Sequence, residues 1–380
     1  MSTGEGEAMS ASERRAVVNR ALPDFPWDRL EPYKELAGRH PGGIVDLSVG
    51  TPVDPTPDAV RKALSEASDA PGYPLTYGAP EVRAAAAGWL RRRLGVDADP
   101  AAVLPAIGTK ELVAWLPTLL GAGPGDQVAF PRLAYPTYDV GARLAGAEPI
   151  ATDGLLSLGP VTPKLIWINS PSNPTGAVLP AEHLRKVVGW ARDRGVLVVN
   201  DECYIEFGWD ATPGRQPVSI LHPDVCEGSH EGLLALHSLS KRSNMAGYRA
   251  GFVTGDPAVV ARLLAVRKHA GMIMPAPVQA AMAVALDDDV HAEEQRARYA
   301  RRRTALKRAL EGHGFRIDHS EAALYLWATR GESCWDTVGH LADLGILVAP
   351  GDFYGPAGDR HVRVAFTATD ERVAAATERL

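Results

Sequence analysis

The chain has 380 residues, of which 46% are hydrophobic and 7% aromatic, which is enough to bury a large core and to divide into two lobes. Its formal net charge is −6, from 40 basic and 46 acidic residues. This balance supplies no basic surface for nucleic acid or for an anionic membrane, so we expect small-molecule substrates.

The first segment, residues 1 to about 20, is polar, and we expect it to be a mobile arm. It lacks the apolar stretch of a secretory signal, and no run in the sequence approaches the roughly 20 apolar residues of a membrane span. The three cysteines, Cys203, Cys226 and Cys334, form no C-x-x-C pair. We therefore expect neither a disulfide framework nor a thiolate metal site, and a cytoplasmic location.

Several β-like runs alternate with amphipathic helical segments. The runs are VAF at 128–130, KLIWINS at 164–170, VLVVND at 196–201, LLALHSL at 233–239 and YRAGFVT at 248–254. Between them, Pro180 begins a helix that ends at Gly195, and Asp256 with Pro257 forms the N-cap and first turn of another. This alternation predicts an α/β fold, with a mostly parallel central sheet and helices on both faces.

The character of the sequence changes after Pro277. A long Arg-rich helical stretch runs to about Gly312, followed by short strands within FRIDH, ALYLWAT, ILVAP and HVRVAF, with helices between and after them. We predict a large ligand-binding domain over residues 46–276 and a smaller α+β domain over 277–380. Residues 21–45 are assigned to the small lobe as well.

Chemically rich motifs follow three of the predicted strands. Residues 170–176 read SPSNPTG, residues 201–204 read DECY and residues 238–241 read SLSK, with Arg249 eight residues further on. In an open parallel sheet, ligands bind outside the carboxyl ends of the strands, so these motifs are expected to meet. An isolated S-x-x-K is more often a surface lysine, but the combination indicates one active site.

In this order the motifs resemble the class I and II aminotransferases, a family of pyridoxal-phosphate enzymes with the fold-type I architecture. The resemblance extends from about Pro23 to the C-terminus. It implies that pyridoxal 5′-phosphate is the cofactor, that Lys241 holds it as a Schiff base and moves the substrate proton, and that Asp201 pairs with the pyridinium nitrogen. The alternative for Asp201 is a residue that only ends a strand.

The resemblance also implies which residues bind the rest of the cofactor. Tyr204 and Asn173 match residues that hydrogen-bond its phenolate oxygen. Residues 107–111 precede a helix, and because a helix N-terminus binds anions, Thr109 and Lys110 are expected at the phosphate. Two further side chains match donors to the same phosphate: Ser238 and Arg249.

Two tyrosine-containing segments match other family elements. Tyr135 resembles the aromatic residue that stacks on the pyridine face, whereas Tyr138, one helical turn later, could instead be a packing residue. Tyr73 matches a tyrosine that reaches the phosphate of the other subunit, with Tyr77 as a weaker candidate. The resemblance therefore implies a homodimer whose active sites lie at the interface.

The substrate carboxylate has its own expected partners. Arg363, in HVRVAF, matches the arginine that clamps the α-carboxylate with a bidentate fork, although an exposed strand arginine is the alternative. Gly50 is expected to offer its backbone to the same group, and Asn173 to contribute from the SNPTG loop. No histidine spacing suggests a metal site.

Three stretches resemble more narrowly the actinobacterial succinyldiaminopimelate aminotransferases of lysine biosynthesis. They cover residues 23–55, 104–121 and 133–147. This resemblance implies exchange of an amino group between N-succinyl-diaminopimelate and glutamate/2-oxoglutarate. An aspartate or broad-range aminotransferase is the nearest alternative. A lyase or decarboxylase of the same fold and a cofactor-sensing regulator remain as further alternatives.

Overall fold

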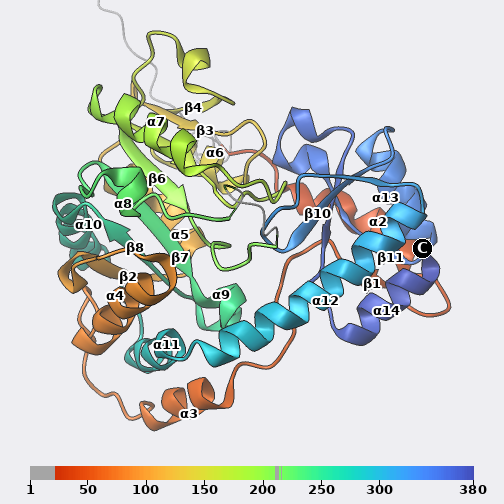
Figure 1. The fold of residues 1–380 in the computed structure, drawn as a ribbon, viewed down its shortest axis with the longest axis horizontal. Coiled ribbons are helices and arrows are strands. Elements are labelled where there is room, and N and C mark those ends of the chain that lie inside the picture. Colours follow the sequence, from red (N-terminus) through yellow and green to blue (C-terminus); the bar gives the residue numbers. More distant parts are fainter. Residues whose placement is uncertain (1–21, 210–213, 215) are drawn as a thin grey trace, which may run out of the picture.

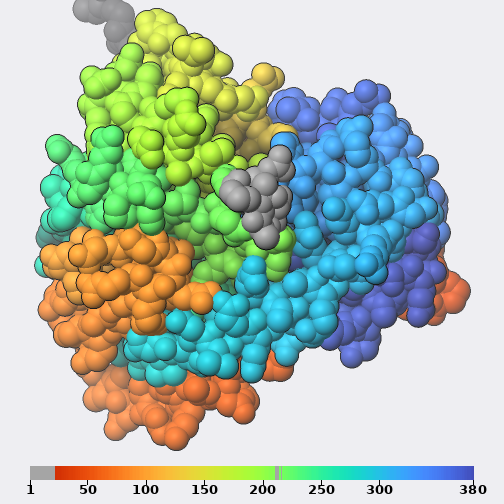
Figure 2. Space-filling view, viewed as in Figure 1, coloured from red at the N-terminus to blue at the C-terminus, as the bar shows by residue number. Residues whose placement is uncertain are grey.

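The computed structural model describes residues 22–209, 214 and 216–380. They form a large part around a seven-stranded sheet and a small part around a four-stranded sheet (Figure 1). In Figure 2 the small part, in blue, packs directly against the large part. The expected N-terminal arm, residues 1–20, lies outside the described residues.

The central sheet is mostly parallel, as predicted. Its order is β2 (Val103–Ile107), β8 (Ala250–Gly255), β7 (Leu233–Ser238), β6 (Leu197–Asp201), β5 (Leu165–Ile168), β3 (Gln127–Phe130) and β4 (Glu148–Ala151). Strand β8 runs antiparallel to both of its neighbours, β2 and β7. The register sets Asp201 beside Leu236 and Ser238 beside Gly251, so the ends of β6 and β7 meet at one edge.

Alternating side chains bury both faces of this sheet. Val198 and Phe252 belong to one hydrophobic cluster, whereas Val199 and Val253, their neighbours in sequence, belong to another. A strand with apolar residues on both faces needs helices on both, which agrees with the predicted layers. The helices are α3 (Asp58–Glu66), α4 (Pro80–Leu94), α5 (Thr109–Leu119), α6 (Thr137–Leu144), α7 (Ala181–Arg192), α8 (Pro223–Cys226), α9 (Leu239–Arg242), α10 (Pro257–Ala270) and α11 (Ala276–Asp287).

Helix boundaries follow the predicted signals where the caps are strong. The Asp256 carboxylate accepts hydrogen bonds from the backbone N–H groups of Ala258 (2.8 Å) and Val259 (3.3 Å), which fixes the start of α10. Short 3₁₀ turns complete the chain: η1 (Pro26–Leu30), η2 (Pro100–Ala102), η3 (Leu155–Leu158), η4 (Ala246–Tyr248), η5 (Gly351–Tyr354) and η6 (Pro356–Gly358).

The small part combines both ends of the chain. Its antiparallel sheet has the order β12 (Ala349–Pro350), β13 (Val362–Ala365), β10 (Tyr325–Thr329) and β9 (Arg316–Asp318). Its other elements are α2 (Glu31–Gly38), β1 (Val45–Asp46), α12 (Val290–Gly312), α13 (Cys334–Asp343), β11 (Ile346–Leu347) and α14 (Asp370–Arg379). Strand β1 pairs in parallel with β11, which joins the N-terminal segment to the C-terminal one.

The long Arg-rich stretch is divided into two helices. It breaks between α11 and α12, and Met282 and Leu286 of α11 lie in the same core cluster as Trp89 of α4. We therefore propose that the small domain begins at α12 rather than at residue 277. Helix α12 then runs from the large part along the small one (Figure 1). Within the described residues, no helix is long and apolar enough to cross a membrane.

Candidate active site

Lys241 lies in the short helix that follows β7. Ser238 caps this helix, α9, because its hydroxyl oxygen accepts a hydrogen bond from the backbone N–H of Ser240 (3.2 Å). Burial lowers the pKa of Lys241, and the charges of Arg363 and Arg249 lower it further, while Tyr325 and Cys203 oppose the shift. A lowered pKa leaves more of the amine neutral, as a nucleophile or base requires.

Asp201 ends β6 as a buried carboxyl group. Its two oxygens accept hydrogen bonds from the Tyr138 hydroxyl (3.0 Å) and from the backbone N–H of Cys203 (3.2 Å). Burial raises the pKa of Asp201, and both hydrogen bonds counteract this shift. Tyr138 is thus more than packing: it stacks on Trp167, with ring centroids 4.9 Å apart, and also fixes the Asp201 carboxylate.

Tyr135 begins the same segment, partly buried, and meets Tyr138 edge-on with ring centroids 5.9 Å apart. Tyr138 therefore supports both predicted residues at this end of the site, Tyr135 through its ring and Asp201 through its hydroxyl. The contact with Asp201 could not be predicted from the sequence, because Tyr138 and Asp201 are 63 positions apart.

Tyr204 and Asn173 lie in the site but bond to different partners. The Tyr204 hydroxyl hydrogen-bonds the Tyr325 hydroxyl (2.8 Å). The Asn173 side-chain oxygen accepts from Nη1 of Arg363 (2.9 Å). Tyr325 was not predicted; its ring centroid lies 4.0 Å from the Arg363 guanidinium carbon, so it links the two predicted residues.

The N-terminus of α5 faces the guanidinium group of Arg249. Gly108 precedes the helix with φ 75°, and Thr109 is its first residue. A Cβ on Gly108 would collide with Arg249, so the guanidinium lies against the backbone there. Free N–H groups and a guanidinium together make an anion-binding site. Lys110 follows in the first turn and is exposed.

Arg363 is buried on β13 between two aromatic rings. Nη1 donates to Asn173 and Nη2 to the backbone oxygen of Ser48 (2.7 Å). Its guanidinium carbon lies 4.0 Å from the Tyr325 ring centroid and 4.9 Å from that of Tyr354. Nε is buried and has no partner among the described residues. One N–H edge of the guanidinium therefore remains available to a planar acceptor such as a carboxylate.

Gly50 and Tyr73 differ sharply in their surroundings. A Cβ on Gly50 would come within 2.5 Å of the Tyr325 hydroxyl oxygen, so no side chain fits beside that ring. Tyr73 is 98% exposed and makes almost no contact within its own chain. Tyr77 instead packs under Arg83, whose guanidinium carbon lies 4.8 Å from the Tyr77 ring centroid. The contact of Tyr73 with another subunit stays a prediction.

The arrangement offers an anion-binding end, an amine of lowered pKa, a buried carboxyl group and an arginine with one free edge. Over residues 22–209, 214 and 216–380, no group of three or more potential ligands among His, Cys, Asp and Glu could hold a metal ion. The available chemistry is proton transfer and nucleophilic attack by an amine, next to sites for two anionic groups.

Comparisons with known proteins agree with this chemistry. The family described as aminotransferase class I and II matches residues 43–380. The chain is 66% identical to the 4-dedimethylamino-4-oxo-anhydrotetracycline transaminase OxyQ of Streptomyces rimosus, over 95% of this chain and 99% of that one. It is 63% identical to the probable aminotransferase Rv1178 of Mycobacterium tuberculosis, over 99% of this chain and 90% of that one.

Solved structures share the fold. The N-succinyldiaminopimelate aminotransferase from Mycobacterium tuberculosis superposes with a TM-score of 0.81 at 27% identity, over 92% of this chain and 98% of that one. An aminotransferase from Neisseria meningitidis superposes with a TM-score of 0.86 at 29% identity, over 96% of this chain and 98% of that one.

Proposed function

The chain belongs to the class I and II aminotransferases and is a pyridoxal-phosphate-dependent transaminase; from this premise we propose that it exchanges an amino group between N-succinyl-diaminopimelate and glutamate/2-oxoglutarate. We further propose that Lys241 is its catalytic amine. The observation that carries the assignment is the place of Lys241 in the short helix just past β7, near enough to Arg249 and Arg363 for their charges to lower its pKa.

The donor set fits the cofactor at both ends. When bound, pyridoxal phosphate supplies an electron sink for the charge left at Cα of the amino acid. The N-terminus of α5, with Thr109 and Lys110, and the guanidinium of Arg249 suit its phosphate. Ser238 pairs with Gly251 in the sheet, and Thr109 lies against Gly251. At the other end, Asp201 suits a protonated ring nitrogen, because a nearby positive charge favours the ionised carboxylate.

Four side chains then divide the remaining tasks. Lys241 would take the proton from Cα of the amino acid, as its lowered pKa allows. Tyr204 and Asn173 would bind the phenolate oxygen of the cofactor, and Tyr135 would cover its ring. Asn173 also holds Arg363, so cofactor binding and substrate binding share one hydrogen bond.

Arg363 binds the α-carboxylate of the substrate through its free edge. Two of its nitrogens are already fixed by Asn173 and by the Ser48 carbonyl, so the guanidinium plane is set before substrate arrives. Such preorganisation lowers the entropic cost of binding and orients the Cα–H bond. Gly50 allows the N-terminal segment to approach because a side chain there would meet Tyr325.

Substrate identity rests on resemblance rather than on this geometry. The three stretches that resemble succinyldiaminopimelate aminotransferases, and the fold shared with the Mycobacterium tuberculosis enzyme of that name, support N-succinyl-diaminopimelate. The 66% identity to OxyQ favours a second candidate, amination of a 4-oxo-anhydrotetracycline, because that value exceeds the identity to the other relatives described above. Aspartate is a third possible donor.

An amino-donor panel with purified holoenzyme tests this proposal. We expect N-succinyl-diaminopimelate and glutamate to convert the cofactor absorbance fastest, with aspartate slower and no reaction after Lys241→Ala. Borohydride should attach the cofactor to Lys241 irreversibly. Amination of the 4-oxo-anhydrotetracycline without reaction of N-succinyl-diaminopimelate would overturn the substrate assignment, and a cofactor attached to another lysine would overturn the assignment of Lys241.

A further inference from the structure

Two buried hydrogen-bond donors have no partner among the described residues. They are the Tyr354 hydroxyl, whose ring lies next to Arg363, and the indole N–H of Trp27, whose ring meets that of Tyr354. Tyr354 is 2% exposed. Buried polar groups are nearly always hydrogen-bonded, because leaving one unsatisfied costs free energy. A phenylalanine at 354 would fill the same volume without this cost, so the hydroxyl needs an explanation.

Both donors belong to the hydrophobic cluster of the small part. Tyr354 ends η5, and its ring centroid lies 4.9 Å from the guanidinium carbon of Arg363. Its backbone oxygen accepts a hydrogen bond from the N–H of Ala134 (2.8 Å), which ties η5 to the residue before Tyr135. Tyr354 is therefore held between the proposed carboxylate clamp and the segment that covers the cofactor.

Trp27 reaches the same place from the N-terminal segment. Its ring meets Tyr354 edge-on, with centroids 6.4 Å apart and an interplanar angle of 89°. It also packs on Phe353 at 5.2 Å. Arg29 of the same turn pairs with Asp352 (3.1 Å) and lies over Trp335 at 4.5 Å, so η1 is anchored on η5 and α13. Trp27 is thus positioned by its neighbours.

The Trp27 indole and the Tyr354 hydroxyl can both donate a hydrogen bond. An indole N–H can only donate, and a tyrosine hydroxyl can donate as well as accept. Burial raises the pKa of Tyr354 far above neutral, so its proton stays in place. Two neutral donors suit a carbonyl oxygen or one oxygen of a carboxylate.

We propose that Tyr354 and Trp27 donate hydrogen bonds to a carbonyl-type oxygen on the substrate side chain. The site then selects amino acids that carry an oxygen acceptor beyond Cα. The inference rests on the proposed role of Arg363, which fixes the α-carboxylate beside Tyr354. The side-chain carboxylate of glutamate and the amide carbonyl of an N-succinyl group both belong to this class.

The test compares glutamate with norvaline, which has a similar chain without the carboxylate. Half-reaction rates are followed through the cofactor absorbance of the holoenzyme. We expect the wild type to prefer glutamate and Tyr354→Phe to lower kcat/KM for glutamate about tenfold, the size of one hydrogen bond. Norvaline should be unaffected, and Trp27→Phe should act in the same direction. Neither variant should lose thermal stability.

Tyr299→Phe is the matched control. Tyr299 is fully buried, but its hydroxyl donates to the side-chain oxygen of Asn244 (3.5 Å), so its loss should not change the preference for glutamate. A wild type without preference for glutamate, equal losses on both substrates, or no loss at all would overturn the proposal. If N-succinyl-diaminopimelate fails to react while Tyr354→Phe removes the preference for glutamate, the proposed substrate is wrong and the inference stands.

Discussion

Two buried arginines, Arg242 and Arg363, are 3% and 4% exposed but have opposite surroundings. Nε of Arg242 donates to the Glu206 carboxylate (2.6 Å), and its Nη2 lies 3.6 Å from the carboxylate of Asp289. The described hydrogen bonds of Arg363 go to neutral oxygens of Asn173 and Ser48. An arginine paired with carboxylates of its own chain holds the fold together; one with neutral partners keeps its charge for a ligand.

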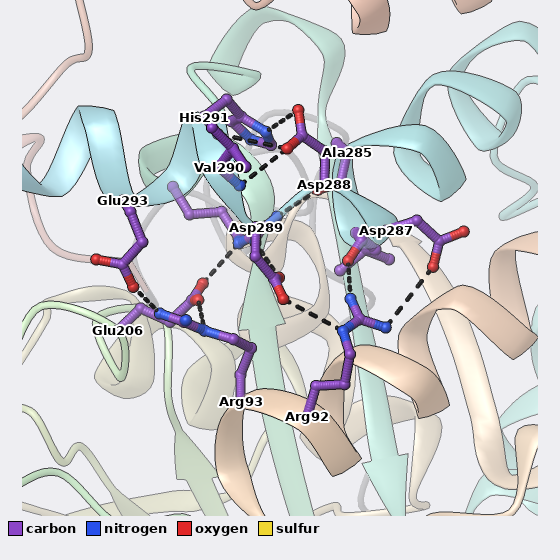
Figure 3. A network of polar contacts seen from close by, with 12 residues as sticks. Arg92, Arg93, Glu206, Ala285, Asp287, Asp288, Asp289, Val290, His291 and Glu293 are labelled. Atoms are coloured by element: carbon purple, nitrogen blue, oxygen red, sulfur yellow. Dashed lines mark hydrogen bonds and ion pairs between the residues drawn. The ribbon is translucent and has the colours of Figure 1, made fainter.

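Arg242 belongs to a network of ion pairs that joins several helices. Figure 3 labels its other members, Arg92, Arg93, Glu206, Asp289 and Glu293. Glu206 also accepts from Nε of Arg93 (3.1 Å), and Asp289 accepts from Nε of Arg92 (3.2 Å). Arg93 in turn pairs with Glu293. The network connects α4, α9 and the start of α12, so the residue after Lys241 is fixed to the helix that leads into the small part.

The largest expected effect comes from breaking the paired arginine. Arg242→Met leaves Glu206 buried beside one remaining arginine, and we expect a loss of about 3–5 kcal/mol of unfolding free energy. Denaturant unfolding of the holoenzyme measures it. The double variant with Glu206→Gln should recover part of the loss, because the unpaired charge is then removed. A loss below about 1 kcal/mol would mean that the network is not structural.

Arg363→Ala should affect function instead. We expect kcat/KM for amino-acid substrates to fall about 100-fold or more, since a bidentate charge-assisted contact is lost. The cofactor absorbance should be unchanged, because Arg363 is assigned to the substrate. Steady-state kinetics and an absorbance spectrum of the same preparation separate the two effects. Loss of cofactor would show that Arg363 is misassigned.

Glu202, directly after β6, and His237 of β7 are two buried titratable groups that lie close together. Glu202 accepts three hydrogen bonds on one oxygen, from Ile220 (2.7 Å), Asn200 (3.0 Å) and Ser219 (3.1 Å), and burial raises its pKa to about 8. His237 lies 3.6 Å away, and burial lowers its pKa to about 3. Both groups are therefore neutral at neutral pH, so this contact is no ion pair.

The folded chain keeps a proton on Glu202 that the unfolded chain releases near pH 4.5. The contribution of Glu202 to the stability of the folded chain is therefore fully present below pH 4.5, and it is lost as the pH rises through about 8. When the pH is raised from about 5.5 to about 7, the titration of Glu202 should lower the unfolding free energy by about 2 kcal/mol. Glu202→Gln should remove this slope, as measured by unfolding at both pH values. An unchanged slope would assign the pH dependence to other groups.

The smallest effect is expected at the outer end of the network. Glu293 is 49% exposed on its side chain and pairs with Arg93 from the solvent side. Glu293→Gln should cost less than about 1 kcal/mol, because exposed ion pairs are screened by water and salt. The same unfolding measurement applies, and a loss as large as that of Arg242→Met would remove the distinction between the core and the rim of the network.

The most accurate predictions from the sequence were those of features that depend on residues close together in the chain. Strand runs, the Asp256 cap and the motifs at the ends of β5, β6 and β7 depend on neighbouring residues, and the layers of the sheet agree with them. Tyr325 and Tyr354 were missed, and so was the hydrogen bond of Tyr138 to Asp201, because these contacts join residues far apart in the chain. Tyr325 meets Tyr204 across 121 positions.

The boundary before α11 shows a different limit. An apolar helix beside an Arg-rich one reads as a single stretch, and composition does not reveal which core it enters. The packing of Met282 and Leu286 with Trp89 could be seen only in three dimensions. The strand β4 was likewise missed, because Glu148–Ala151 is short, partly exposed and without alternation.

The pairing of β1 with β11 limits when the small part can fold during translation. Val45 lies beside Ile346, so about three hundred residues must be synthesised between the two partners. The central sheet uses strands that end at Gly255 and can form earlier, whereas the small part must wait until β11 and β13 have left the ribosome. A nascent chain that stalls before Arg363 would carry most of the cofactor-binding residues but lack the proposed substrate clamp.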